Sequence, residues 1–330
     1  MFGGRGWIRT TEAEKQQIYS LSPLATREHA QILFTSVAGR LVYFIRLQAI
    51  CQLLFSDFCS FSAEAVGRVS FGSDVSGARN PARRHARALA GICQYAENTY
   101  FGKPSGQLDQ LASAVGGVIF ADFADPAAPQ VEKIHADGLL PPGMTLCVTD
   151  TRGSHSELTG EFAAIRQEME AVAACLGGKV LGQVPETDFW AALPRLRTAC
   201  GDRAVLRAIH YYEENARTLA QRRALLEKRF ADFAALVLES GRASFALCQN
   251  VYCATDVRHQ GLSVALALSQ SILQGSSGAW RMQGGGFAGT IQAYVPETLL
   301  QRYHTAMERV FGPGSCYVLR LREQGARQVL

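Results

Sequence analysis

Apolar residues recur at helical spacing along several stretches of the chain. Over residues 161–175 they occupy every third or fourth position, which predicts an amphipathic helix that ends at Gly177-Gly178. A longer helical region is predicted over residues 207–240, with Leu219 and Leu226 among the side chains that face inward. Further helices are predicted over residues 88–100, from about residue 108, over residues 261–273 and over residues 296–311.

Short apolar runs between glycine-rich and proline-rich turns predict strands. These runs cover residues 117–123, 131–136, 145–149, 279–282, 289–295 and 315–321. Together with the helices they predict an α+β fold. Residues 1–88 do not settle into clear elements, and their last part, residues 76–84, is predicted to be a loop because it is rich in glycine, asparagine, proline and arginine.

Composition narrows the class of protein. With 330 residues, 48% of them hydrophobic and 19% charged, the chain can bury a sizeable core, which excludes disordered and small disulfide-framework proteins. The net charge is +4, and the excess lies in residues 1–88, where the arginines form no helical stripe. We therefore expect no nucleic-acid partner. The apolar stretch at residues 41–61 is interrupted by polar residues, so we also expect no membrane span.

The cysteines and the start of the chain bear on its compartment. The nine cysteines form no C-x-x-C pair, and their odd count suits buried free thiols in a reducing compartment rather than a disulfide framework or a metal cage. Residues 1–20 lack the apolar run of a signal peptide. We therefore expect a cytoplasmic protein.

Glycines are concentrated at residues 284–289, which satisfy the dinucleotide pattern G-x-G-x-x-G. That pattern binds a pyrophosphate only where the glycines lead from a strand into a helix, whereas residues 290–295 alternate as a strand. The segment is therefore predicted to be a turn between two strands. Two hypotheses remain for it: a plain hairpin turn, or a turn whose missing side chains let another backbone or a ligand come close.

Two carboxylates lie on either side of a proline-glycine turn. Glu97 is on the helix before the turn and Asp109 on the helix after it, so both can converge on one pocket. A metal ligand and a general base require such an arrangement. The alternative is that Asp109 only complements the dipole of its helix and that Glu97 is solvated.

Taken together, these segments resemble the galactokinase branch of the GHMP small-molecule kinases. Residues 97–113 are similar to that family's central motif, E-N…G-x-P-C-G-x-M-D-Q-x-A-S, and residues 278–289 to its C-terminal glycine motif. Short matches at residues 207–218 and 239–240 lie between them in the expected order. The resemblance implies an α+β, GHMP-kinase two-lobed fold with an incomplete N-terminal lobe and with C-terminal helices packed on an antiparallel sheet.

The resemblance divides the chain into three parts. Residues 1–88 are a non-matching, poorly ordered segment, residues 89–150 a remnant of the N-terminal lobe, and residues 151–330 the C-terminal lobe. The activity implied is transfer of the ATP γ-phosphate to the C1 hydroxyl of galactose, with Mg²⁺ as cofactor. We expect a monomer whose partners are ATP and galactose or a related sugar.

Site residues follow from the matched motifs. Asp109 matches the catalytic aspartate beside the anomeric hydroxyl, and Glu97 the acid that holds magnesium. Gly106 matches a glycine whose backbone lies against the sugar. Phe162 stands where the family has a sugar-binding tyrosine, and its ring can stack on a sugar face. The glycines expected to support the ATP phosphates are Gly284, Gly285 and Gly286.

Residues 1–88 depart from the family pattern. They contain neither its opening sugar-binding signature nor its phosphate-binding loop, of which residues 72–77 are a faint echo. We therefore expect a truncated or frame-disrupted N-terminal part that packs poorly. Two further hypotheses stay open beside the galactokinase: a non-catalytic relic or sugar-sensing protein, and a kinase for another hexose.

Overall fold

A computed structural model describes residues 40–43, 81–100, 106–125, 128–135, 137–153 and 158–325 of the chain. The prediction of poor packing for residues 1–88 concerns mostly residues outside these ranges. The phosphate-loop echo at residues 72–77 and the proline-serine pair of the turn at residues 104–105 also lie outside the described residues.

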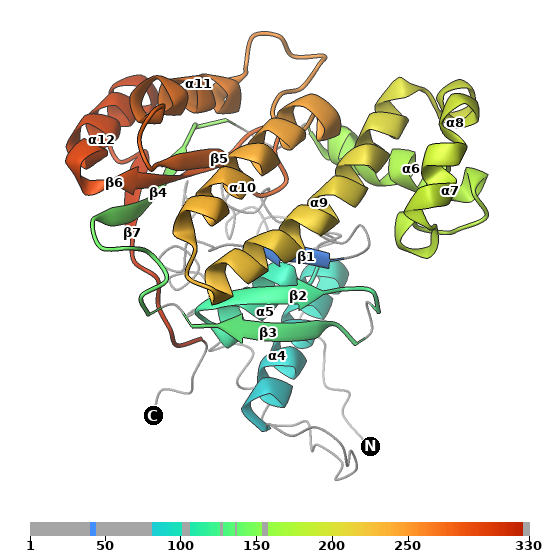
Figure 1. Ribbon diagram of the computed structural model, residues 1–330, viewed down its shortest axis with the longest axis horizontal. Helices are drawn as coiled ribbons and strands as arrows, with labels where there is room; N and C mark the ends of the chain where they lie inside the picture. The colour runs from blue at the N-terminus through green and yellow to red at the C-terminus, as the bar shows by residue number, and fades with distance from the viewer. Residues whose placement is uncertain are drawn as a thin grey trace, which may run out of the picture.

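Runs of antiparallel strands and runs of helices follow one another along the described chain (Figure 1). In chain order the elements are β1 (Arg40–Tyr43), α4 (Pro81–Tyr100), α5 (Leu108–Val115), β2 (Val118–Asp122), β3 (Gln130–Ile134), β4 (Met144–Asp150), α6 (Thr159–Cys175), the 3₁₀ turn η2 (Leu181–Gln183), α7 (Glu186–Ala191), α8 (Leu193–Cys200), α9 (Asp202–Leu226), α10 (Phe230–Ala243), the π-helical turn η3 (Ser244–Cys248), α11 (Gly261–Leu273), β5 (Ala279–Gln283), β6 (Thr290–Pro296), α12 (Glu297–Phe311) and β7 (Cys316–Leu319).

The larger sheet has the strand order β5-β6-β4-β7, and all its pairs are antiparallel. Ala293 and Val295 of β6 belong to the core formed with α11 and α12, whereas Tyr294 belongs to the core formed with α9 and α10. Because successive side chains of a strand point to opposite faces, helices cover both faces of this sheet. The near-complete burial of β6 follows from that position.

The smaller sheet, β1-β2-β3, is also antiparallel and lies below α9 in Figure 1. Leu108 and Leu111 of α5 are fully buried and share a core with Ala90 of α4 and Ile119 of β2. On the opposite side of β2, the Arg222 guanidinium of α9 lies 5.4 Å from the centre of the Phe120 ring. The α+β architecture with C-terminal helices on an antiparallel sheet is as predicted.

The start of α4 corrects one prediction. Residues 76–84 were expected to form a loop, but the helix begins at Pro81. Proline is well tolerated at the first helical position, since its ring sets a helical φ and the missing N–H would have no partner inside the helix. The alanines and arginines that follow are good helix formers.

The predicted helical region at residues 207–240 is two helices, α9 and α10. The break is a tight turn in which Lys228 has a φ of 55° and the Arg229 N–H donates to the Ala224 carbonyl at 2.7 Å. The inward orientation expected of two leucines is wrong, since Leu219 is 37% exposed and Leu226 is 47% exposed. The two leucines are seven positions apart and so lie on one stripe of α9, whereas the buried stripe carries Thr218, Gln221 and Leu225.

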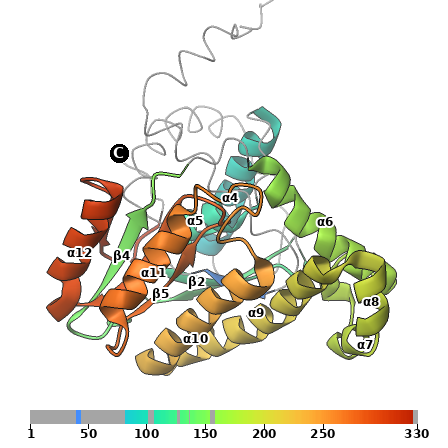
Figure 2. The same ribbon diagram turned by 90° about the horizontal axis from the view of Figure 1, so that it is seen from above.

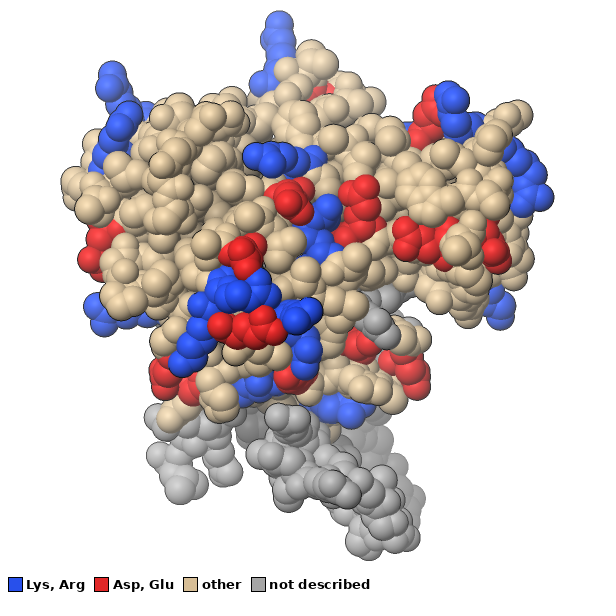
Figure 3. Space-filling model, in the orientation of Figure 1, with Lys and Arg blue, Asp and Glu red and all other residues tan. Residues whose placement is uncertain are grey.

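Surface charge is mixed on the face that carries α9 and α10. Basic and acidic side chains are interspersed there (Figure 3), and many are paired, such as Arg223 with Glu227 at 2.9 Å and Arg222 with Glu132 at 2.6 Å. Within the described ranges, no helix combines the length and the apolar character needed to cross a bilayer.

Candidate active site

The two predicted carboxylates lie at adjoining ends of packed helices. Glu97 is in the last turn of α4, and Asp109 is in the first turn of α5. Gln110, which is 3% exposed, donates a hydrogen bond from its side-chain amide to Oε1 of Glu97 at 2.9 Å. The structure therefore brings Glu97 beside the turn of helix that carries Asp109, and both side chains are partly exposed.

Burial of α5 fixes where Asp109 lies. Leu108 and Leu111 are both fully buried, so the face of the helix between them is anchored to the core. Gly106 is also buried and lies directly before Gln107, the residue that caps α5. A carboxylate in the first turn interacts favourably with the positive end of the helix dipole. Asp109 is thus held on a rigid element with its charge stabilised.

The glycine segment at residues 284–289 connects β5 to β6, which confirms the prediction of a turn between two strands. Gly286 has a φ of +93°, and a Cβ atom built on it would lie 1.9 Å from the Asn250 carbonyl oxygen. The Phe287 N–H donates to that same oxygen at 2.5 Å, and the Asn250 side-chain amide donates to the Gly285 carbonyl at 3.0 Å. Another backbone segment therefore occupies the space that the glycines leave.

Two further residues, Arg207 and Thr151, hold the segment before Asn250 and the end of the glycine turn. The guanidinium of Arg207, which is fully buried, donates to the Cys248 carbonyl at 3.1 Å and to Glu168 at 2.8 Å. At the other end, the backbone N–H and the hydroxyl of Thr151 both donate to the Gly289 carbonyl, at 2.9 and 2.7 Å. The turn is thus held by α9 through residue 248 and by the end of β4.

Phe162 packs against the glycine turn. Its ring meets the Phe287 ring edge to face, with centroids 5.2 Å apart and an interplanar angle of 85°. At 2% exposure the Phe162 ring is covered by protein, which accounts for an apolar residue at this position. Its expected stacking on a sugar stays a prediction. The structure thus brings Phe162 together with the glycine turn, and Glu97 together with the start of α5.

Sequence reasoning missed Asn250 and Thr151. Each acts on a backbone carbonyl of the glycine turn, 35 positions away for Asn250 and 138 for Thr151. Every residue type has a backbone carbonyl, so a side chain that hydrogen-bonds to one has no characteristic partner residue. Spacing rules therefore cannot detect such a contact. Only the run of glycines indicated that something approaches closely here.

A buried polar cluster joins α9, α10 and β5. Glu214 pairs with Arg217 and accepts a hydrogen bond from Ser240, whose hydroxyl also receives one from Arg281 at 2.6 Å. Burial alone would raise the pKa of Glu214, but the charges of Arg281, His210 and Arg217 together lower it below its usual value. Glu214 is therefore ionised at neutral pH.

His210 adjoins this cluster and is mostly buried on α9. Burial lowers the pKa of His210 to about 4, an effect that Glu214 opposes and that Arg281 and Arg217 reinforce. Since the folded-state pKa lies below the ordinary histidine value of 6.5, the unfolded chain binds this proton more readily. Stability from neutral His210 is therefore present above about pH 6.5 and is lost as the pH falls toward 4.

A His210→Gln variant is expected to remove that part of the pH dependence. Between pH 7 and pH 5, the free energy of unfolding of the wild-type chain should fall by about 2 kcal/mol more than that of the variant. Urea unfolding of both proteins at the two pH values measures the difference. Parallel losses of stability in the two proteins would show that His210 titrates normally.

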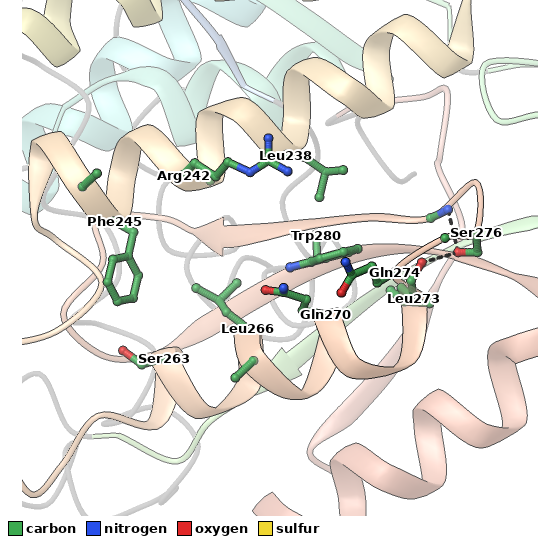
Figure 4. A pocket seen from close by; sticks show the side chains of 15 residues that line it. Leu238, Arg242, Phe245, Ser263, Leu266, Gln270, Leu273, Gln274, Ser276 and Trp280 are labelled. Carbon is green, nitrogen blue, oxygen red and sulfur yellow. Dashed lines mark hydrogen bonds between the residues drawn. The ribbon is translucent and has the colours of Figure 1, made fainter.

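A pocket of about 620 Å³ lies elsewhere, between α10, α11 and β5. Phe245, Leu266 and Trp280 lie along it (Figure 4). None of the predicted site residues lines this pocket. It is therefore distinct from the two groups described above, which lie near α5 and at the β5–β6 turn.

The described residues contain no group of three or more histidine, cysteine, aspartate or glutamate side chains placed to hold a metal ion. A nucleotide-bound Mg²⁺ requires less, because it takes one or two carboxylates and fills its other positions with phosphate oxygens and water. The hard carboxylate oxygens of Glu97 fit that requirement, and the hydrogen bond from Gln110 orients the group.

The curated proteins to which this chain is similar include several galactokinases. The galactokinase of Streptomyces coelicolor is 34% identical over 249 residues, which cover 73% of this chain and 60% of that protein. The galactokinase of Streptomyces lividans is 34% identical over 226 residues, or 68% of this chain and 53% of that protein. The galactokinase of Mycobacterium tuberculosis strain H37Rv is 31% identical over 243 residues, with 72% and 60% covered.

Among solved structures, Lactococcus lactis galactokinase complexed with galactose matches with a TM-score of 0.57 and 21% identity. The match covers 76% of this chain and 62% of that one. No family model matches the chain. The matched region thus spans between about half and three fifths of the length of the curated relatives.

Proposed function

We propose that this chain, a galactokinase-like protein with the GHMP-kinase fold, transfers the γ-phosphoryl group of ATP to the C1 hydroxyl of galactose. The observation that carries the proposal is the position of Asp109 in the first turn of α5, directly before the glutamine that bonds to Glu97. Phosphoryl transfer depends mainly on the positioning of the reacting groups and on the stabilisation of charge, and the adjoining ends of α4 and α5 supply both.

Asp109 acts on the hydroxyl that attacks the phosphorus. Its carboxylate accepts the C1 hydroxyl proton or orients that hydroxyl by a hydrogen bond, and the rigid attachment of α5 limits the orientations of the side chain. Accepting a proton at this carboxylate raises the charge density on the attacking oxygen. The backbone at buried Gly106 lies against the sugar ring in this proposal.

Glu97 would hold a magnesium ion, whose charge would neutralise the ATP phosphates when the nucleotide is bound. The Gln110 hydrogen bond fixes one carboxylate oxygen of Glu97 and so orients the group. Gly284, Gly285 and Gly286 support the phosphate side of the site, since their tight turn is held against Asn250. We place the N-terminal lobe at residues 89–150 and the C-terminal lobe at residues 151–330.

The same proposal covers the oligomeric state, the compartment and the partners of the protein. We propose a monomer in the cytoplasm that binds ATP and a hexose and that binds neither nucleic acid nor membrane. The mixed charge on the face with α9 and α10 supports the absence of a nucleic-acid surface there (Figure 3).

Galactose-dependent release of ADP by the full chain tests the proposal. With MgATP and galactose present, we expect ADP to form in proportion to the protein, and ATP without sugar to be hydrolysed far more slowly. Titration calorimetry with each ligand separates the alternatives. Galactose binding without ADP release would favour the sugar-sensing protein, and an absence of ATP binding would contradict the kinase.

Phe162 favours one second candidate, a kinase for another hexose. The family has a tyrosine at this position, and Phe162 cannot donate a hydrogen bond to a sugar hydroxyl. The ring packs against Phe287 and carries no hydroxyl, so the hydrogen bond that the tyrosine would supply is missing. A panel of hexoses in the ADP assay tests this, and a higher kcat/KM for another hexose than for galactose would support the second candidate.

A further inference from the structure

An accessible pair of thiols lies where α6 and α8 end. Cys175 is the last residue of α6 and Cys200 the last of α8, and their sulfur atoms are 3.4 Å apart. Cys175 is exposed and Cys200 is partly exposed. The other described cysteines, Cys93, Cys147, Cys248, Cys253 and Cys316, are buried. The expectation of buried free thiols thus holds for those five and is wrong for Cys175.

The two helix ends are held against each other independently of the sulfur contact. Arg195 of α8 donates a hydrogen bond from its guanidinium to the Cys175 carbonyl at 3.2 Å. The α6 end is closed by the Gly178 N–H, which donates to the Ala173 carbonyl at 2.9 Å. Phe189 of α7 and Leu196 of α8 are fully buried in the core that α6 also lines. The thiols are therefore positioned by the packing around them.

We propose that Cys175 and Cys200 form a reversible disulfide by exchange with small disulfides of the glutathione class. The Cys175 thiolate attacks one sulfur of the small disulfide, whose S–S bond breaks to give a mixed disulfide and one released thiolate. Cys200 then loses its proton and attacks the Cys175 sulfur, which releases the second small thiolate. The protein pair loses two electrons and two protons, and the small disulfide gains them as two thiols.

The exposure of Cys175 and the raised pKa of Cys200 set the order of the two exchange steps. Cys175 reacts first because it is the more exposed thiol. Burial and the hydrogen bond with Cys175 raise the pKa of Cys200 to about 11, so at neutral pH it is almost wholly protonated and is a poor first nucleophile. The bond would tie the unit formed by α7 and α8 to the end of α6, the helix that carries Phe162 (Figure 2).

The test uses the full chain with Cys51 and Cys59, which lie outside the described residues, replaced by serine. The protein is equilibrated with reduced and oxidised glutathione at a series of ratios, quenched, alkylated and mapped by mass spectrometry. We expect a single link between the Cys175 and Cys200 peptides. We also expect the thermal midpoint of the linked form to lie about 5 °C above that of the reduced form.

Two single-cysteine variants identify which thiol attacks the small disulfide and which thiol resolves the mixed disulfide. Cys200→Ser should accumulate a glutathione adduct at Cys175, because no thiol remains to resolve it. Cys175→Ser should form an adduct at least about tenfold more slowly. Cys147 and Cys316, which also contact each other but are buried, are the internal control and should stay reduced. An absence of the Cys175–Cys200 link at every ratio, or a Cys147–Cys316 link forming first, would overturn the proposal.

Discussion

An Asp109→Asn variant is expected to lose galactose-dependent ADP release by about 10²–10⁴-fold. Asparagine has nearly the same size but carries no charge and cannot accept the hydroxyl proton. The fold should be unaffected, since Leu108 and Leu111 anchor α5 from its other face. Steady-state kinetics of ADP release, together with a thermal unfolding curve, measure both effects.

Asp125→Asn provides the matched control for this substitution. Asp125 follows β2, in the connection to β3, and is exposed, whereas Asp109 is partly exposed. The same loss of charge there should leave turnover within about twofold of the wild type. Full turnover by Asp109→Asn would remove the role proposed for that carboxylate, whereas equal losses in both variants would point to a general effect of net charge.

Gly286→Ala is expected to destabilise the protein by about 4 kcal/mol. The added Cβ would lie 1.9 Å from the Asn250 carbonyl oxygen, so either the turn or the segment around residue 250 must shift. That shift would break the hydrogen bonds between Asn250 and the turn, while the φ of +93° adds strain of its own. The midpoint of urea unfolding, with its slope, measures the loss.

A Gly312→Ala variant separates the cost of backbone strain from the cost of a steric clash of the added Cβ. Gly312 has a φ of +92°, but a Cβ built there meets nothing within 4 Å. Only the conformational cost of about 1–2 kcal/mol remains, so this variant should be clearly more stable than Gly286→Ala. If the two variants unfold at the same urea concentration, the turn and Asn250 are not in the close contact described above.

Elements with a clear apolar period were predicted, whereas two short helices without one were missed. The helix expected at residues 261–273 has the bounds of α11, because its apolar residues repeat over three turns. Residues 186–200 form α7 and α8, which were not predicted. Helices of six and eight residues, with one buried apolar anchor each, Phe189 and Leu196, are too short to show a period.

The candidate site was predictable where its residues are close in sequence. The turn between Glu97 and Asp109 can be inferred from glycine and proline, whose backbone preferences are local. The contact between Asn250 and the glycine turn depends instead on how η3 follows α10, and no local preference determines that. The break at Lys228 is of the same kind, since a left-handed lysine is favoured only by the packing on either side of it.

The strand order of the larger sheet has a consequence for synthesis. β4 hydrogen-bonds to β6 and β7, and its first residue, Met144, is aligned with Pro296. A growing chain therefore exposes β4 with its apolar Leu146 and Val148 long before either neighbour has left the ribosome. High contact order makes such pairing slow. Until β6 and β7 are synthesised, neither edge of β4 can form its hydrogen bonds to these two neighbours.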